Sequence, residues 1–293
     1  MKNIAVIGLG SMGMGMAKSL IIDGFTVSGY DLNPITTAAL SEFGDCETGA
    51  EPISSASKFD AVLFVLVNAA QIESALFESG LDRQLSEKCI VSIHSTILAD
   101  ESKSIAARLG ARNIRMIDAP ISGGAAKAAI GELTIMAAAK YADMQAIKPV
   151  FDAIASHVYH IGEDIGLGSS VKTIHQLLAG VHIAAAAESM AMAAKAGIDL
   201  NIMYDVVTHA AGNSWMFENR MQKVLTGDYT PNSMVDIFVK DLGLVLDTAH
   251  GLKFPLPLAS AAHQMFLAAS NEGFGQLDDS AVIKIFKGIK LPE

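Results

Sequence analysis

The stretch VIGLGSMGMGMA, residues 6–17, decides the fold prediction. It places Gly8, Gly10 and Gly13 in a GxGxxG spacing between an apolar strand pattern and a helical pattern. In this spacing the first glycine permits a tight turn, the second lets the backbone approach a pyrophosphate, and the third lets helix and strand pack closely. The anion then lies at the helix N-terminus. Glycine turns of this kind also occur where a helix and a strand merely pack together. The motif therefore indicates a nucleotide site only if the residues that follow it also fit one.

A second predicted strand, residues 25–31, ends at Asp31, which is 18 positions after Gly13. A carboxylate at that point can accept both hydrogen bonds of an adenosine ribose, and it would repel a 2′-phosphate. Leu32 stands where NADP-dependent enzymes often have an arginine, so NAD is the expected cofactor. An Asx-type turn at Asp31, with Asn33 capping the next helix, is a second interpretation that is compatible with the first.

Short apolar strands alternate with helices through the first half of the chain, which predicts a parallel sheet covered on both faces. From residue 167 onward only helical spacing remains, and a single helix could span 167–196. The predicted fold is therefore α/β, with a Rossmann-type doubly wound sheet in residues 1–163 and an all-α domain in residues 164–293. The second domain would begin with a long interdomain helix, and the segment 121–131 is expected to be a loop.

Composition excludes several classes of partner. The chain has 293 residues and a net charge of −10, which disfavours binding to nucleic acid or to an anionic membrane. The most apolar window, residues 177–194, is interrupted by His182 and Glu188, so it does not indicate a membrane span. Two cysteines without a CxxC pattern fit a reducing compartment, and a cytoplasmic protein is expected. The apolar helical half favours a homodimer or homotetramer.

Five segments occur in the order typical of the β-hydroxyacid (3-hydroxyisobutyrate dehydrogenase-like) family, which the chain resembles over essentially its whole length. They are GLGSMGMGMA (8–17), HSTI (94–97), DAPISGGAAKAAIGELTIM (118–136), GLGSSVK (166–172) and KDL (240–242). The resemblance implies an NAD-dependent dehydrogenase that oxidises a CH–OH carbon of a small hydroxy acid.

The resemblance also implies a set of site residues. Lys172 would be the general acid/base, because a partly desolvated lysine can take the hydroxyl proton near neutral pH. The substrate carboxylate would lie against Ser122, Gly123 and Gly124, whose loop offers backbone N–H groups and a hydroxyl. The residues implied for the cofactor are Gly8, Leu9, Gly10, Ser11, Met12, Gly13, Asp31, Leu32, Val67, Asn68, Thr96 and Lys240.

Each of these residues also has a simpler interpretation. A lysine near a helix start is usually a solvated surface residue. The SGG sequence can be an ordinary loop, Thr96 can end a strand, and Lys240 with Asp241 can be a surface pair that contributes little. Their joint order along the chain favours the functional interpretation.

His175 and Gln176 follow Lys172 at i+3 and i+4, so a helix would place all three on one face. Ala179 and Gly180 continue this face with small residues, which predicts a polar patch with room beside it. The commonest family pattern has asparagine at both positions, and the longer side chains here suit a substrate with extra hydroxyls. Seven residues separate His175 from His182, about 10.5 Å along a helix, which is too far for one metal ion. No metal is expected.

The reaction that the resemblance implies is oxidation of a short polyhydroxylated acid, with L-threonate to 2-oxotetronate as the favoured case and His175 and Gln176 as substrate-binding residues. The alternatives within this class are D-glycerate or tartronate semialdehyde, and 3-hydroxyisobutyrate. The alternative from another class is a non-catalytic NAD-binding sensor or scaffold. That alternative would require loss of the lysine or of the carboxylate loop, and both are present.

Overall fold

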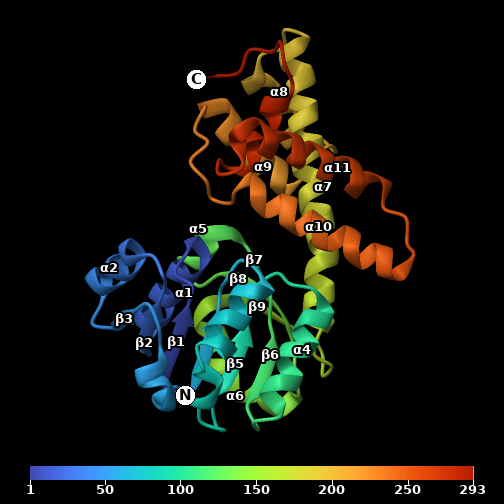
Figure 1. Cartoon of the computed structure of the whole chain (residues 1–293). Helices are drawn as coiled ribbons and strands as arrows, with labels where there is room; N and C mark the ends of the chain where they lie inside the picture. The colour runs from blue at the N-terminus through green and yellow to red at the C-terminus, as the bar shows by residue number, and fades with distance from the viewer. Residues whose placement is uncertain (293) are drawn as a thin grey trace. The chain divides into compact units, whose positions relative to one another are not determined.

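The structure, a computed structural model, describes residues 1–292 (Figure 1). The chain divides into two compact units, Met1–Lys172 and Thr173–Glu293. The division falls inside one long helix, whereas the sequence prediction placed a boundary at residue 163. Each unit is described separately below.

The first unit contains a nine-stranded sheet within the described residues. Its strands are β1 (Asn3–Ile7), β2 (Thr26–Tyr30), β3 (Glu47–Gly49), β4 (Ala61–Phe64), β5 (Ile90–Ile93), β6 (Arg115–Asp118), β7 (Ile121–Ser122), β8 (Leu133–Ala138) and β9 (Ala155–Gly162). Its α-helices are α1 (Ser11–Ile22), α2 (Pro34–Phe43), α3 (Ala69–Glu73), α4 (Ala99–Gly110), α5 (Gly124–Ala128) and α6 (Tyr141–Ile154), and α7 begins at its end. A π-helical turn, Ser74–Glu78, continues α3, and 3₁₀ turns lie at Ile53–Lys58 and Leu81–Arg83.

The strand order is β3-β2-β1-β4-β5-β6-β8-β7, with β9 paired to β8. The chain therefore reverses its direction of travel across the sheet between β1 and β4, which both run parallel to their neighbours. In open α/β sheets ligands bind at such a switch point, beyond the carboxyl ends of the strands. The loops after β1, β4 and β5 consequently lie at the edge where a cofactor is expected.

Both faces of the sheet are buried, as a doubly wound fold requires. Along β1, Ile4 and Val6 pack into a core with α1 and α6, while Ala5 and Ile7 pack into a second core with α4. Alternate side chains of a strand point to opposite faces, so both faces of β1 must be covered by helices. This confirms the predicted Rossmann-type architecture, which is visible in Figure 1.

The parallel order predicted for the first strands does not extend to one end of the sheet. β8 runs antiparallel to both β6 and β7. β7 begins three residues after β6 and pairs with the same strand, so the chain reverses directly into β8 and needs no crossover. The segment 121–131, expected to be a loop, forms this reversal and contains β7 and α5. The positive φ angles of Gly123 (131°) and Gly124 (75°) permit the sharp turn.

The start of α7 is attached to the sheet through one buried carboxylate. Asp118, the last residue of β6, is fully buried and accepts hydrogen bonds from the backbone N–H groups of Gly166 and Ser169, both at 2.9 Å. The hydroxyl of Ser169 donates to its other oxygen at 2.7 Å. Burial raises the pKa of Asp118, although these hydrogen bonds oppose the rise. The first turn of α7 is thereby fixed at the carboxyl end of β6.

The second unit is helical and has its own core. Its elements are the continuing α7 (Leu167–Lys195), α8 (Leu200–Thr208), α9 (Trp215–Thr226), α10 (Val235–Leu252), α11 (Pro257–Ala269), a π-helical turn (Ser270–Phe274) and a 3₁₀ turn (Asp279–Ile285). The predicted helix over 167–196 matches α7 to within one residue. In the core, the rings of Phe238 and Phe266 stack with centroids 5.2 Å apart. An added Cβ at Gly180 would come within 2.9 Å of the Leu242 methyl groups, so α7 and α10 are in close contact there.

We predict that Asp118→Ala lowers the free energy of unfolding by roughly 3 kcal/mol or more, because it leaves several buried donors without an acceptor. The matched control is Asp45→Ala, which removes an exposed carboxylate and should change the free energy by less than about 0.5 kcal/mol. Chemical denaturation of both variants measures the difference. Equal small effects would show that Asp118 does not hold the start of α7.

Candidate active site

The glycines of the loop between β1 and α1 have different surroundings. Gly8 has a φ of +95°, and an added Cβ would lie 2.4 Å from the Val65 carbonyl oxygen. An added Cβ at Gly13 would lie 1.8 Å from the carbonyl oxygen of Gly8, so this close approach admits only glycine. An added Cβ at Gly10 would meet nothing within 4 Å. The loop therefore keeps open space at the position where a pyrophosphate is expected.

The N-terminus of α1 fits an anion. Its N-cap is Gly10, which makes no side-chain capping hydrogen bond, and its first turn contains no acidic residue. The first N–H groups of a helix have no partner within it, and the helix dipole favours negative charge at this end. Together with the open space at Gly10, these features match the pyrophosphate of a dinucleotide. Ser11 and Met12 form the first turn.

Asp31 connects the glycine loop to the end of β2. One carboxylate oxygen accepts a hydrogen bond from the Leu9 N–H at 2.7 Å, and the other accepts from the Asn33 N–H at 2.8 Å. The Asn33 side chain in turn accepts from the Ile35 N–H and caps α2. The Asx-type turn expected from the sequence is therefore present, and it holds the carboxylate beside the glycine loop. Leu32 is 85% exposed next to it.

The loops after β4 and β5 lie at the same edge, because these strands are parallel neighbours of β1 and of each other. The Leu66 N–H donates to the hydroxyl of Ser95 at 3.0 Å, which joins the two loops. Val67 is 44% exposed, and the Asn68 side chain caps α3 by accepting from the Gln71 N–H at 2.9 Å. Thr96 follows directly after Ser95 and is partly buried. The structure thus brings these candidate cofactor residues to the edge where the glycine loop lies.

His94, which follows β5 at the same edge of the sheet, is not suited to proton transfer. Its Nδ1 lies 2.8 Å from the Ala119 carbonyl oxygen, and its ring packs edge-on against Phe151. Burial lowers the pKa of His94 to about 4, so the ring is neutral at physiological pH. Its contacts join the ends of β5 and β6, which is a structural role.

The candidate carboxylate cradle opens α5. Ser122 ends β7, Gly123 is the N-cap of α5, and no side chain caps this helix end. An added Cβ at Gly124 would meet nothing within 4 Å, so its backbone is accessible. An added Cβ at Gly123 would lie 3.1 Å from both Cβ and Cδ of Lys127, so the lysine stem packs across the cradle. Lys127 was not singled out in the sequence, although its position within the SGGAAK segment adds a positive charge beside the predicted carboxylate site.

Lys172 lies in the second turn of α7 and is only 6% exposed. This burial contradicts the alternative of a solvated surface lysine. Ser169, one turn earlier, is held by Asp118 as described above, so the backbone at Lys172 has a fixed position relative to β6. Burying an ammonium group costs free energy, so a buried lysine is a candidate for a functional residue.

In the helical unit, two hydrogen bonds and one ion pair connect four polar side chains of α7 and α10. Nδ1 of His175 lies 3.0 Å from Oε1 of Gln176, and Nε2 of Gln176 donates to Oδ2 of Asp241 at 2.5 Å. Nζ of Lys240 lies 2.7 Å from Oδ1 of Asp241. The interpretation of Lys240 and Asp241 as a surface pair was wrong, because Asp241 is 2% exposed.

Two further findings differ from the sequence analysis. The room expected beside His175 and Gln176 at Gly180 is filled by Leu242, since α10 packs closely there. Asp241 was not recognised as a functional candidate. A signal was available, because Asp241 shares the helical spacing of the buried residues Phe238, Leu242 and Val245 and therefore belongs to the apolar face of α10.

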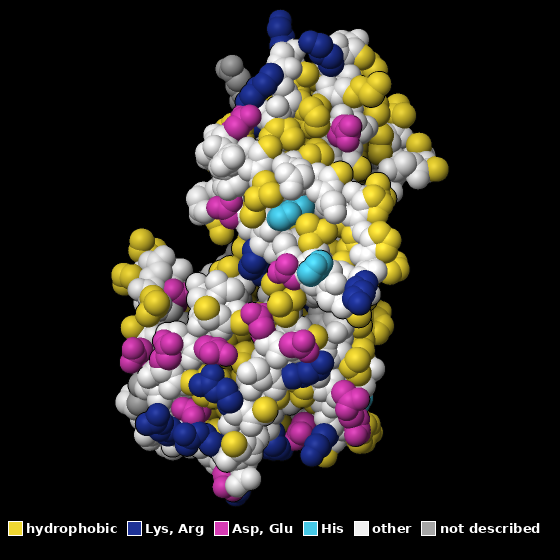
Figure 2. All heavy atoms as spheres, turned by 45° about the vertical axis from the view of Figure 1, so that its right-hand side comes forward, with side chains coloured by type: hydrophobic (Ala, Val, Ile, Leu, Met, Phe, Trp, Pro, Cys, Tyr) yellow, Lys and Arg dark blue, Asp and Glu magenta, His cyan; other side chains and the backbone are white. Residues whose placement is uncertain are grey.

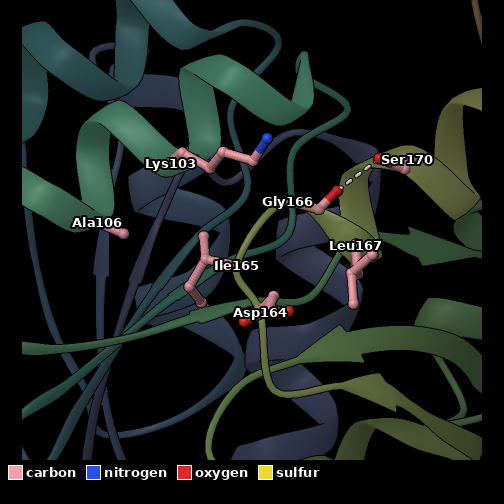
Figure 3. Close-up of a pocket in the computed structure, with 7 residues that line it drawn as sticks. All are labelled: Lys103, Ala106, Asp164, Ile165, Gly166, Leu167 and Ser170. Carbon is pink, nitrogen blue, oxygen red and sulfur yellow. Dashed lines mark hydrogen bonds between the residues drawn. The ribbon is translucent and has the colours of Figure 1, made fainter.

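A hollow of about 580 Å³ lies beside the start of α7 (Figure 3). Its lining residues are Lys103, Ala106, Asp164, Ile165, Gly166, Leu167 and Ser170. It contains none of the candidate catalytic, cofactor or substrate residues, although Gly166, Leu167 and Ser170 belong to the GLGSSVK segment. Its lysine already pairs with Asp100 at 3.0 Å. The hollow is therefore separate from the candidate site residues at the strand ends.

Within residues 1–292, no group of three or more histidine, cysteine, aspartate or glutamate side chains is arranged to hold a metal ion. Among the described residues, α7 is the one helix long and apolar enough to cross a membrane by length and composition, and half of its most apolar window is buried inside the protein.

Comparison with known proteins matches the two units to two family models. The model described as the NAD binding domain of 6-phosphogluconate dehydrogenase matches residues 3–162, and the model described as NAD-binding of NADP-dependent 3-hydroxyisobutyrate dehydrogenase matches residues 166–286. The chain belongs to the 3-hydroxyisobutyrate dehydrogenase-like (β-hydroxyacid dehydrogenase) family. Its cofactor is therefore a nicotinamide dinucleotide, which the glycine loop and the N-terminus of α1 fit, and members of this family oxidise a CH–OH carbon.

Individual relatives are similar over nearly the whole chain. An L-threonate dehydrogenase of Pectobacterium atrosepticum is 58% identical, with 99% of this chain and 96% of the relative covered. An L-threonate dehydrogenase of Escherichia coli is 56% identical over the same shares. A solved structure of a 3-hydroxyisobutyrate dehydrogenase from Salmonella typhimurium is 56% identical, with a TM-score of 0.93 over 98% of this chain and 100% of that chain.

We predict that Gly10→Ala folds normally but weakens NAD binding by roughly tenfold or more, because the added methyl group occupies space that the pyrophosphate needs. Gly110→Ala, in α4, is the matched control, since its added Cβ also meets nothing within 4 Å. Calorimetric titration with NAD and a thermal melt of each variant measure both properties. Unchanged NAD affinity in Gly10→Ala would contradict the cofactor position.

Proposed function

We propose that this protein uses NAD to oxidise a short polyhydroxylated acid, and that the acid is L-threonate, oxidised at C2 to 2-oxotetronate. The observation that carries this proposal is the His175–Gln176 pair, an imidazole and an amide joined by a hydrogen bond three and four residues after the buried Lys172. A substrate with several hydroxyls can match these groups, whereas a simple hydroxy acid leaves polar groups without a partner. The names of the relatives from Pectobacterium and Escherichia support the same acid.

In the proposed reaction the substrate carboxylate binds the N–H groups at Ser122, Gly123 and Gly124, with Lys127 adding positive charge. Lys172 accepts the proton of the C2 hydroxyl as the C–H bond breaks, which leaves a ketone at C2. The bound nicotinamide supplies the hydride acceptor. We propose that Thr96 and Lys240 contact the cofactor, as the family resemblance implies, and that His175 and Gln176 contact the remaining hydroxyls of the substrate.

The names of similar proteins differ in substrate. The solved Salmonella structure carries the name 3-hydroxyisobutyrate dehydrogenase at an identity close to that of the L-threonate dehydrogenases. 3-Hydroxyisobutyrate has one hydroxyl, and its methyl group offers no partner to an imidazole or an amide. The polar pair at 175 and 176 therefore favours the four-carbon sugar acid.

We propose NAD over NADP because of Asp31. Its carboxylate, held by the N–H groups of Leu9 and Asn33, would repel a 2′-phosphate, and the neighbouring Leu32 offers no compensating positive charge.

A panel of acids tests the proposed function. L-threonate, D-glycerate, tartronate semialdehyde and 3-hydroxyisobutyrate are each assayed with NAD or NADP, or with the reduced cofactor for the semialdehyde. We expect L-threonate with NAD to have the highest kcat/KM by roughly tenfold or more. A higher value for a simpler acid would assign the protein to that acid. NAD binding without turnover of any acid would instead support the non-catalytic sensor.

We predict that Lys172→Ala retains NAD binding and loses kcat by about 10²- to 10⁴-fold, because no other group replaces the general base. Lys148→Ala, which removes an exposed lysine paired with Asp152 on α6, is the control and should retain full activity. Steady-state kinetics and NAD titration of both variants provide the measurement. Substantial activity in Lys172→Ala would disprove the assigned role.

We also propose that the protein is a cytoplasmic homo-oligomer. Ile174, Leu178 and Met192 on α7 are 65%, 54% and 74% exposed, which is unusual for large apolar side chains on one helix. Hydrophobic side chains are also frequent over the helical unit in Figure 2. The mass of the purified protein in solution tests this, and a mass of one chain would contradict it.

A further inference from the structure

In the network between α7 and α10, the chemistry of Asp241 determines which group donates and which accepts in each hydrogen bond. Asp241 is a carboxylate and can only accept, so the group of Gln176 that lies 2.5 Å from it must be the NH₂ group. The carbonyl oxygen of Gln176 then faces His175, at 3.0 Å from Nδ1. Because this oxygen can only accept, Nδ1 of His175 must carry the hydrogen. A neutral His175 therefore has its lone pair on Nε2.

The network is buried and has little freedom to rearrange. Asp241 is 2% exposed and Gln176 is 7% exposed. Leu242 packs against the backbone of Gly180, one turn after Gln176 on α7, which fixes the separation of the two helices beside the network. The second oxygen of Asp241 lies 2.7 Å from Nζ of Lys240, so the carboxylate contacts Gln176 through one oxygen and Lys240 through the other. A buried carboxylate with fixed partners imposes its hydrogen-bond pattern on them.

We infer that Asp241 is a positioning residue that determines substrate specificity. By accepting a hydrogen bond from the Gln176 amide, Asp241 favours the Nδ1–H tautomer of His175, in which Nε2 is the acceptor nitrogen of the ring. An acceptor at this point selects substrates that donate a hydrogen bond, namely acids with hydroxyls beyond the one that is oxidised. The inference rests on the proposed function for its substrate, but the tautomer of His175 can be tested without any substrate.

Nitrogen-15 NMR of protein labelled in histidine reports which ring nitrogen carries the hydrogen. We expect His175, assigned with the variant His175→Gln, to show the Nδ1–H tautomer in the wild-type protein. In Asp241→Asn the amide of Gln176 loses the charge that orients it, and the signal should move toward the Nε2–H form. Asp247→Asn is the matched control, since it makes the same change at an exposed position on α10 and should leave the tautomer unaltered.

Kinetics then separate positioning from a purely structural role. We expect Asp241→Asn to lower kcat/KM for L-threonate by roughly tenfold or more, mainly by raising KM, and to change kcat/KM for 3-hydroxyisobutyrate much less. The ratio of kcat/KM for L-threonate to kcat/KM for 3-hydroxyisobutyrate should therefore fall. If Asp241 acts through Gln176 on His175, Asp241→Asn should leave this ratio unchanged in the His175→Ala background. A change that persists there would overturn the inference, as would an unaltered tautomer in Asp241→Asn.

Two further outcomes are distinguishable. If Asp241→Asn does not fold, Gln176→Met interrupts the same network while leaving Asp241 and Lys240 in place, and it should abolish the Nδ1–H preference. A preserved Nδ1–H tautomer in Gln176→Met would overturn the inference. If the tautomer shifts as expected but the wild-type protein oxidises none of the acids, the proposed function is wrong while the positioning of His175 by Asp241 stands.

Discussion

The carboxylate of Asp118 accepts three hydrogen bonds from the chain at the start of α7, and it does so at the end of a sheet strand with no exposure to solvent. Burial alone would make an ionised carboxylate costly, and the hydrogen bonds offset that cost. The consequence is geometric. Lys172 lies one turn beyond Ser169, so its position relative to the strand ends follows from a contact made by other residues.

The same edge of the sheet carries two helix starts that suit anions. The first turns of α1 and α5 contain no acidic residue and no side-chain cap, and glycine keeps the backbone accessible at each. The helices pack side by side, since the hydroxyl of Ser19 donates to the Ala128 carbonyl oxygen at 3.0 Å and Gly15 leaves no room for a side chain against Ala128. The proposed pyrophosphate and carboxylate sites therefore lie at the same edge of the sheet, as a dehydrogenase of hydroxy acids needs.

Much of this could be predicted from the sequence because it depends on local spacing. The glycine loop, the position of Asp31 and the length of α7 follow from patterns within about 30 residues. The antiparallel β8 could not be predicted, because its direction depends on which strand it pairs with and not on its own apolar pattern. The same limit applies to the hydrogen bonds that Asp118 accepts from Gly166 and that Asp241 accepts from Gln176, which join residues 48 and 65 positions apart in the sequence. Sequence order places Gln176 on a helix, but only the packing of α10 against Gly180 brings Asp241 to it.

The pair at 175 and 176 differs from two asparagines in more than length. An asparagine side chain ends about 1.5 Å short of a glutamine, so from the same backbone its amide would not reach Asp241 as Gln176 does at 2.5 Å. That hydrogen bond would be lost, and an asparagine at 175 has no ring nitrogen whose hydrogen could be fixed. The hydrogen bonds of His175 and Gln176 therefore depend on the close contact of α7 with α10. If the proposed substrate role holds, a change of substrate class within this fold involves the helix contact, the amide and the imidazole together.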